Sequence, residues 1–143
     1  MAKETSIAES LSRAHQALRK DLQRLEDSVH RTLDQGMSII RALLDATRTH
    51  ILEHFRFEEK NGYMDKVRNR EPRLDHAIDQ LAGEHRQLAL SLEDLIRKAK
   101  QASILDQELR ERTREWIEAV RQHEAREDKL VQNAFNMDIN AGD

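Results

Sequence analysis

The sequence predicts an all-α protein, a single up-down-up-down antiparallel four-helix bundle. Helix breakers are rare, with 4 glycines and 1 proline in 143 residues, whereas charged residues make up 36% of the chain. Apolar residues recur three and four positions apart along four long segments, which is the period of a helix with one buried face. The breaks between these segments are short, and short breaks favour antiparallel neighbours.

One domain is expected to span residues 1–143, with helices over about 5–30, 34–61, 72–100 and 103–135. The first turn is expected at 34–36, and the Asn-Gly pair at 61–62 suits the end of the second helix. A polar loop then leads to Pro72, which suits the first turn of the third helix. Ser103 is a candidate N-cap for the fourth helix. The periodicity stops near residue 135, so the tail 136–143 is expected to fray.

Composition excludes several classes of protein. The net charge is -3 and the chain has no basic stripe, so nucleic acid is not expected as a partner. Cysteine is absent, which excludes disulfides, thiolate metal sites and a cysteine nucleophile. No apolar run approaches the roughly 18 residues of a membrane span, and the first residues lack the apolar core of a signal peptide. We expect a cytoplasmic monomer without a membrane partner, and the sequence identifies no protein partner.

Each predicted helix carries one histidine on its apolar face. These histidines are His15, His54, His85 and His123. Two of them are followed four residues later by a glutamate, Glu58 or Glu127. Four residues turn a helix by about 400°, so each histidine shares one helix face with its glutamate. Both side chains of a pair can therefore point into the bundle.

The four histidines are also expected at one height in the bundle. In an antiparallel hairpin, residues equally far from the turn lie side by side. The midpoint between His15 and His54 falls in the turn at 34–36, and that between His85 and His123 falls near Ser103. A lone histidine on an apolar face is commonly an ordinary core residue, but four in one layer indicate a shared role. Burial without partners would cost roughly 2 kcal/mol or more per group, and bound cations would remove that cost.

The donor set favours two iron ions. Imidazole and carboxylate ligands without thiolates suit iron, manganese or zinc. Six ligands are too many for one tetrahedral zinc, but they suit two metals that share two bridging glutamates. Iron is therefore expected, with manganese and zinc as lesser alternatives. The predicted ligands are His15, His54, Glu58, His85, His123 and Glu127.

Three further residues are weaker candidates for the metal site. Asp128 competes with Glu127 as a bridging carboxylate, although the four-residue step keeps Glu127 nearer the buried face. His50 lies one turn before His54 but beside the buried face, which favours a supporting or surface role over ligation. Tyr63 follows the second helix and could reach a metal, although capping or packing is its default role.

These motifs resemble the hemerythrin-like, or HHE cation-binding, family over about residues 5–135. The resemblance rests on four segments: Ala14-His15-Gln16, His54-Phe55-Arg56-Phe57-Glu58-Glu59, Glu84-His85-Arg86-Gln87-Leu88 and His123-Glu124-Ala125-Arg126-Glu127. It implies a non-haem di-iron centre with an oxo or hydroxo bridge in a hemerythrin-like bundle. By analogy, His15 and His54 bind one iron and the other two histidines bind the second. The two glutamates bridge the ions.

One departure from the oxygen-carrying members bears on function. Those proteins have a fifth histidine one turn from the histidine of the third helix, whereas this sequence has Leu81 and Ala89 there. The second iron then has room for an exogenous ligand. The remaining ligand set looks more like that of bacterial hemerythrin-like proteins linked to nitric oxide and peroxide stress.

The sequence thus predicts a non-haem di-iron protein that binds or reacts with nitric oxide, hydrogen peroxide or dioxygen in a stress response. Whether it is an enzyme stays open, because no general base stands out; an enzyme of this kind would be a di-iron oxidoreductase that consumes peroxide or nitric oxide. The alternative is a module that binds or senses oxygen or iron without turnover. A third hypothesis is a metal-free interaction bundle, which predicts no bound metal and no response to a chelator.

Overall fold

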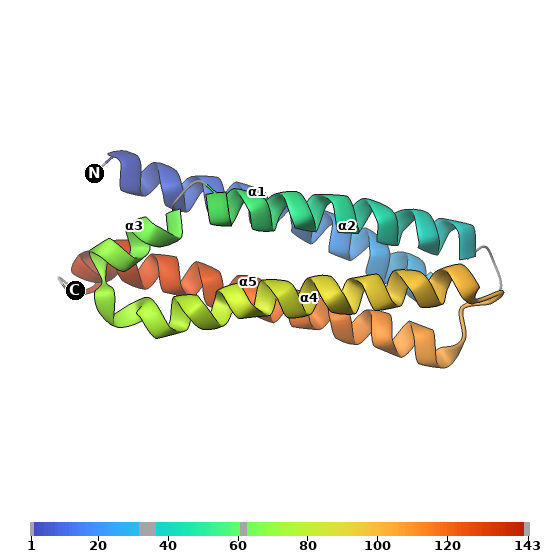
Figure 1. Ribbon diagram of the computed structural model, residues 1–143. Helices are drawn as coiled ribbons and strands as arrows, with labels where there is room; N and C mark the ends of the chain where they lie inside the picture. The colour runs from blue at the N-terminus through green and yellow to red at the C-terminus, as the bar shows by residue number, and fades with distance from the viewer. Residues whose placement is uncertain (1, 32–36, 61–62, 142–143) are drawn as a thin grey trace.

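A computed structural model confirms the all-α fold and its antiparallel order (Figure 1). It describes residues 2–31, 37–60 and 63–141, with side chains over 9–30, 37–59 and 64–134. The long helices are α1 (Ala2–Arg31), α2 (Met37–Lys60), α4 (Asp75–Gln101) and α5 (Gln107–Ala141). Helix α1 packs against α2 and α5, and α4 packs against the same two helices, so the four form a closed ring around one core. Both ends of the chain lie at the same end of the bundle.

The segment before α4 is more regular than the predicted polar loop. It contains a short helix, α3 (Tyr63–Arg70), and a 3-10 turn, η1 (Pro72–Leu74). Helix α3 lies at the end of the bundle that holds the termini, and it contacts α2 and α5 (Figure 1). Val67 of α3 is fully buried against the core. The segment therefore covers one end of the bundle, and Pro72 opens the 3-10 turn that leads into α4.

The boundaries of α5 differ most from the prediction, whereas α1, α2 and α4 begin within three residues of their predicted starts. Helix α5 begins at Gln107 rather than near residue 103, because the carboxylate of Asp106 caps it by accepting a hydrogen bond from the Leu109 N–H at 2.8 Å. Asp106 is thus the N-cap, and Ser103 is not. Helix α5 also continues to Ala141, past the predicted end at residue 135. The predicted turn at 34–36 and the Asn-Gly pair at 61–62 lie outside the described residues.

The apolar core is divided into two clusters. The larger, which we call the turn-side cluster, runs toward the α4–α5 connection and includes Leu22, Leu44, Leu92 and Ile117. The smaller, which we call the terminal cluster, consists of Leu11, Val67, Ile78, Leu81, Leu130, Val131 and Ala134. On α1, α4 and α5, the histidine predicted to be a ligand lies between residues of the two clusters, whereas His54 of α2 is flanked by Ile51 and Phe55 of the turn-side cluster. The histidine layer is therefore enclosed along the bundle axis by packed apolar side chains.

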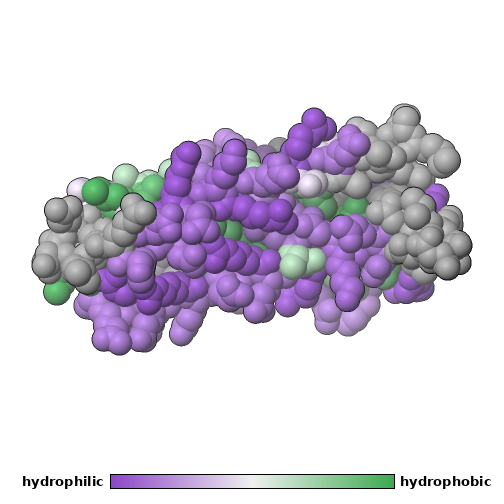
Figure 2. Space-filling model, turned by 180° about the vertical axis from the view of Figure 1, so that it is seen from behind, coloured by the Kyte–Doolittle hydropathy of each residue, from purple (hydrophilic) through white to green (hydrophobic). Residues whose placement is uncertain are grey.

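The outer surface carries the polar residues that the periodicity predicts. Figure 2 shows one face of the bundle, which is mainly hydrophilic with small hydrophobic groups. In the part of the chain that the structure describes, no helix has the length and apolarity needed to cross a bilayer.

Candidate metal centre

Six buried side chains from all four long helices meet between the two apolar clusters. Their exposed fractions run from 0% for His15 and both glutamates to 6% for His54. They form two groups of closely spaced donor atoms, and Glu127 belongs to both. The first group is His15, His54, Glu58 and Glu127; the second is His85, His123 and Glu127. The structure thus brings together all six residues predicted to be ligands.

The histidines are arranged as two pairs of neighbouring rings. The ring centroids of His15 and His54 lie 4.8 Å apart, and those of His85 and His123 are also 4.8 Å apart. The first pair joins the two helices of the first hairpin, α1 and α2. The second pair joins the two helices of the second hairpin, α4 and α5. The pairing matches the grouping of one histidine pair per iron that the family resemblance implies.

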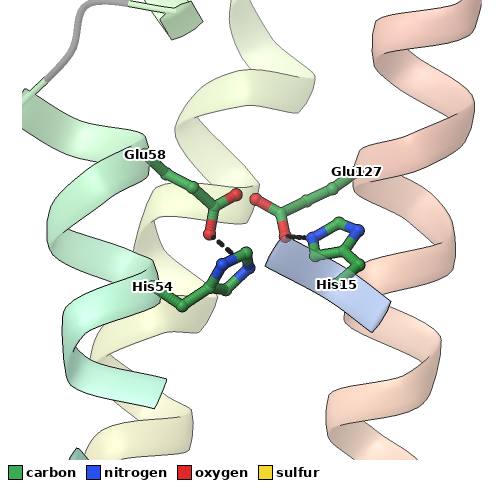
Figure 3. Close-up of side chains that lie close together, drawn as sticks. All are labelled: His15, His54, Glu58 and Glu127. Atoms are coloured by element: carbon green, nitrogen blue, oxygen red, sulfur yellow. Dashed lines mark ion pairs between the residues drawn. The ribbon is translucent and has the colours of Figure 1, made fainter. Parts of the chain in front are cut away.

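The two glutamates lie between these histidine pairs. Figure 3 shows the carboxylates of Glu58 and Glu127 pointing toward one another from α2 and α5. Glu127 lies 3.3 Å from His15 Nε2 and 3.1 Å from His123 Nε2, so one carboxylate reaches both pairs. Glu58 similarly lies 3.1 Å from His54 Nε2 and 3.5 Å from His85 Nε2. These positions suit carboxylates that bridge two cations.

In three of the four histidines, a carboxylate contacts Nδ1, the ring nitrogen that faces away from the centre, and so orients the ring. His15 Nδ1 hydrogen-bonds to Asp128 at 2.7 Å, and His123 Nδ1 hydrogen-bonds to Glu84 at 2.7 Å. His85 Nδ1 has a longer contact of 3.4 Å with Glu59. Such partners fix the tautomer, so that the Nε2 atom facing the centre carries the lone pair that a cation needs.

The inward-facing nitrogens fit a metal better than they fit the protein alone. The Nε2 atoms of His15, His54 and His123 are buried and lie 3.1–3.3 Å from glutamate oxygens, but among the described residues none of the three makes a well-aligned hydrogen bond. Leaving buried polar atoms without hydrogen bonds costs about 1–3 kcal/mol each. Coordination would satisfy all three at once, and the donor set of imidazoles and carboxylates is one that iron, manganese and zinc accept.

The charges of the metal-free centre follow from the same contacts. Burial opposes protonation of His15, but the hydrogen bond to Asp128 and the negative charges of Asp128 and Glu127 outweigh it and raise its pKa to about 9. His54 lacks such partners, so burial, together with the charge of His15, lowers its pKa to about 4. Burial would raise the pKa of Glu127, but hydrogen bonds with Glu58 and the surrounding histidines bring it well below the usual range. The centre therefore holds protons that a cation would displace.

The weaker candidates lie elsewhere. Asp128 contacts the outer nitrogen of His15 and also accepts a hydrogen bond from Arg19 at 2.9 Å, so it supports the ring from behind. His50 is exposed and hydrogen-bonds to Asp21 through Nδ1, and it belongs to neither group of donors. Helix α3 begins at Tyr63, but the side chain of this residue lies outside the described part of the structure.

Glu124 is a buried acidic residue that the sequence analysis missed. Its side chain is 2% exposed, and neither carboxylate oxygen has a hydrogen bond within the described residues. Burial, together with the nearby carboxylates of Asp128 and Glu127, raises its pKa to about 7, although the charges of His15 and Arg19 oppose this rise. The signal in the sequence was the stripe of buried residues at heptad spacing on α5, in which 124 follows 117 and 120 and precedes 127 and 131.

Comparison with known families decides the assignment. The chain matches the family described as Hemerythrin HHE cation binding domain over residues 6–135. The protein is a member of this family. No curated protein and no solved structure matched the chain.

The family match gives the buried cluster its chemical meaning. An HHE domain is a cation-binding domain, and the buried histidine and glutamate cluster of this one is compatible with metal binding. The family resemblance places the further histidine of oxygen carriers one turn from His85, where this chain has Ala89 and Leu81, the latter 4% exposed. Leu81 also lines a cavity of about 320 Å³ between α4 and α5, together with Glu84. This cavity reaches Glu84, the carboxylate that hydrogen-bonds to His123, but neither His85 nor His123 is among its lining residues.

Proposed function

We propose that this HHE domain holds two iron ions and binds or reduces a small oxidant, which could be nitric oxide, hydrogen peroxide or dioxygen. The observation that carries the proposal is the pair of histidine groups joined by one shared carboxylate, Glu127. In the proposed centre, His15 and His54 hold one ion, and His85 and His123 hold the other. When bound, iron supplies the electrons and an open position for the oxidant.

The protein's own residues would do three things. The carboxylates behind the rings keep each Nε2 atom turned inward, which sets ligand orientation and basicity. The turn-side and terminal clusters limit the entry of water along the bundle axis. Glu58 and Glu127 would each offer a carboxylate to both cations, because each lies within 3.5 Å of a histidine from either pair.

Metal analysis with absorption spectra tests this proposal. The purified protein is expected to bind two iron ions per chain and to change its near-ultraviolet and visible absorption when peroxide or nitric oxide is added. His54→Ala and Glu58→Ala are expected to lower the iron content. His76→Ala is the matched control, because His76 is an exposed histidine on α4. Two irons and an unchanged response in both ligand variants would refute the assignment.

A module that binds oxygen or iron reversibly, without turnover, is the second candidate function. The enclosure of the centre by apolar clusters favours it, because a dry site protects a bound diatomic from side reactions. Repeated loss and recovery of absorption on cycling oxygen, without net consumption of peroxide or nitric oxide, would support this candidate. Multiple turnovers of either oxidant would support an enzyme.

A further inference from the structure

The two halves of the centre are related by an approximate repeat in the sequence. His85 and His123 of the second hairpin correspond to His15 and His54 of the first, and Glu127 corresponds to Glu58. The outer carboxylates follow the same relation, since Glu59 and Asp128 each follow the bridging glutamate of their helix. Glu59 contacts His85 and Asp128 contacts His15, so each hairpin supports a histidine of the other.

The first hairpin lacks one part of this repeat, the carboxylate that would contact the outer nitrogen of His54. The residue that supports His123 is Glu84, which directly precedes His85, and Glu84 itself accepts a hydrogen bond from Arg126 at 2.6 Å. In the first hairpin the position before His15 is Ala14, and the position that corresponds to Arg126 is Phe57. The carboxylate and guanidinium of one half are therefore replaced by a methyl group and a phenyl ring in the other.

His54 is consequently the least supported of the four rings. Its Nδ1 atom is buried and has no hydrogen-bond partner in the described ranges of the chain. At 6% its exposed fraction is also the largest of the four histidines. The ring of His85, whose own carboxylate contact is long, is instead held by Phe55, which stacks on it with centroids 4.0 Å apart and planes 12° apart.

A surface groove reaches this ring. It has a volume of about 500 Å³ and runs between α1 and α2, and His54, Ala14 and Phe57 all line it. The two residues that break the repeat therefore also form part of the groove wall. Basic and acidic side chains, among them Lys20 and Asp21, line it as well, so water and hydrated ions can enter it.

We propose that His54 is the exchangeable ligand of the centre, so that the cation held with His15 leaves and enters through the groove between α1 and α2. The cation held by His85 and His123 leaves more slowly. This inference rests on the proposed two-cation site. Its physical basis is that a hydrogen-bonded partner on the outer nitrogen of a ligating histidine strengthens metal binding about 10–100-fold. His54 lacks that partner, and its side chain lines the groove through which a released cation would leave.

The proposal is tested on the full chain by measuring the rate at which iron passes to a ferrous chelator, which is monitored by the absorbance of the chelator complex. Wild-type protein loaded with two iron(II) ions under anaerobic conditions is expected to release them in two phases, each accounting for one ion. Ala14→Glu places a carboxylate where Glu84 lies in the other half, so the fast phase is expected to slow by about 10-fold or more. Ser12→Glu is the matched control, because it adds the same charge at an exposed position of α1 outside the groove.

Glu84→Ala is the reciprocal variant. It removes the partner of His123, so the slow phase is expected to accelerate toward the fast one while the fast phase stays unchanged. This variant also keeps the proposal testable if Ala14→Glu does not fold. Two bound ions that leave in a single phase, or a fast phase unaffected by Ala14→Glu, would overturn this inference alone. Fewer than two bound ions in the wild-type protein would overturn the proposed function as well.

Discussion

Asp128 and Glu127, neighbours in the sequence, contact opposite nitrogens of His15. Asp128 accepts a hydrogen bond from Nδ1 at 2.7 Å, whereas Glu127 lies 3.3 Å from Nε2. One residue along a helix is a rotation of about 100°, so Glu127 points into the bundle and Asp128 points along the side of α1. The ring of His15 is thus held between two carboxylates, only one of which faces the centre.

The two carboxylates are therefore expected to differ in their effect on metal content. Glu127→Ala removes a donor shared by both histidine pairs, so it is expected to abolish binding of at least one ion. Asp128→Ala leaves the donors in place and is expected to retain both ions with about 10–100-fold weaker affinity. Metal analysis and competitive titration with a chelator measure both effects. Equal losses of metal in the two variants would contradict the assignment of Glu127 as the bridge.

Metal binding is expected to release protons at neutral pH. In the metal-free protein the raised pKa of His15, about 9, keeps this ring protonated at pH 7, and a cation requires it neutral. Apparent affinity should accordingly fall as the pH drops below about 9, and the contribution of His15 should vanish above that value. Proton release into a weakly buffered indicator solution measures the effect. Asp128→Asn should reduce the release at pH 7, because it removes the negative charge that helps to raise the pKa of His15.

The histidine layer could be predicted from the sequence because it depends only on helical periodicity and on the lengths of the connections between helices. His54 and Glu58 share a face whatever surrounds them, and short connections fix the heights of neighbouring helices. The role of Asp128 could not be predicted in this way, because it depends on how α5 is rotated against α1. The same holds for the groove at His54, which results from the side chains that α1 and α2 present to each other.

Helix α3 was missed for a different reason. It has only 8 residues, and Val67 is its one fully buried side chain among those that the structure describes. Arg68 and Arg70 near its end make the segment resemble a polar loop. Its position depends on tertiary contacts with α2 and α5, which a short window of sequence does not contain.

Replacement of Glu124 is expected to stabilise the metal-free protein in a pH-dependent manner. Its pKa rises from 4.5 to about 7 on folding, so the unfolded chain ionises first as the pH increases. The free energy of unfolding is then unaffected below about pH 4, falls between the two pKa values and is constant above about 7. Since one pKa unit corresponds to about 1.4 kcal/mol, Glu124→Gln should add roughly 1–3 kcal/mol at pH 8.

Urea unfolding of the metal-free protein at pH 4 and pH 8 measures this change. The control is Glu118→Gln, at an exposed position of the same helix, which should change stability by less than about 0.5 kcal/mol. A gain from Glu124→Gln that is equal at both pH values would show that burial of the charge is not its cause. A loss at pH 8 would indicate that the ionised carboxylate makes a favourable contact in the folded state.

Removal of the metal is expected to destabilise the bundle without unfolding it. The turn-side and terminal clusters bury apolar residues from every long helix and do not depend on the centre for their contacts. At a free concentration 100 times its dissociation constant, each bound cation would add about 2.7 kcal/mol to the free energy of unfolding. Circular dichroism should therefore show a helical protein after treatment with a chelator, with a thermal midpoint that recovers when iron is restored. In Glu58→Ala the midpoint should respond little to added iron, whereas in His76→Ala it should respond as in the wild type. A midpoint that is insensitive to both chelator and iron in the wild-type protein would favour a metal-free bundle.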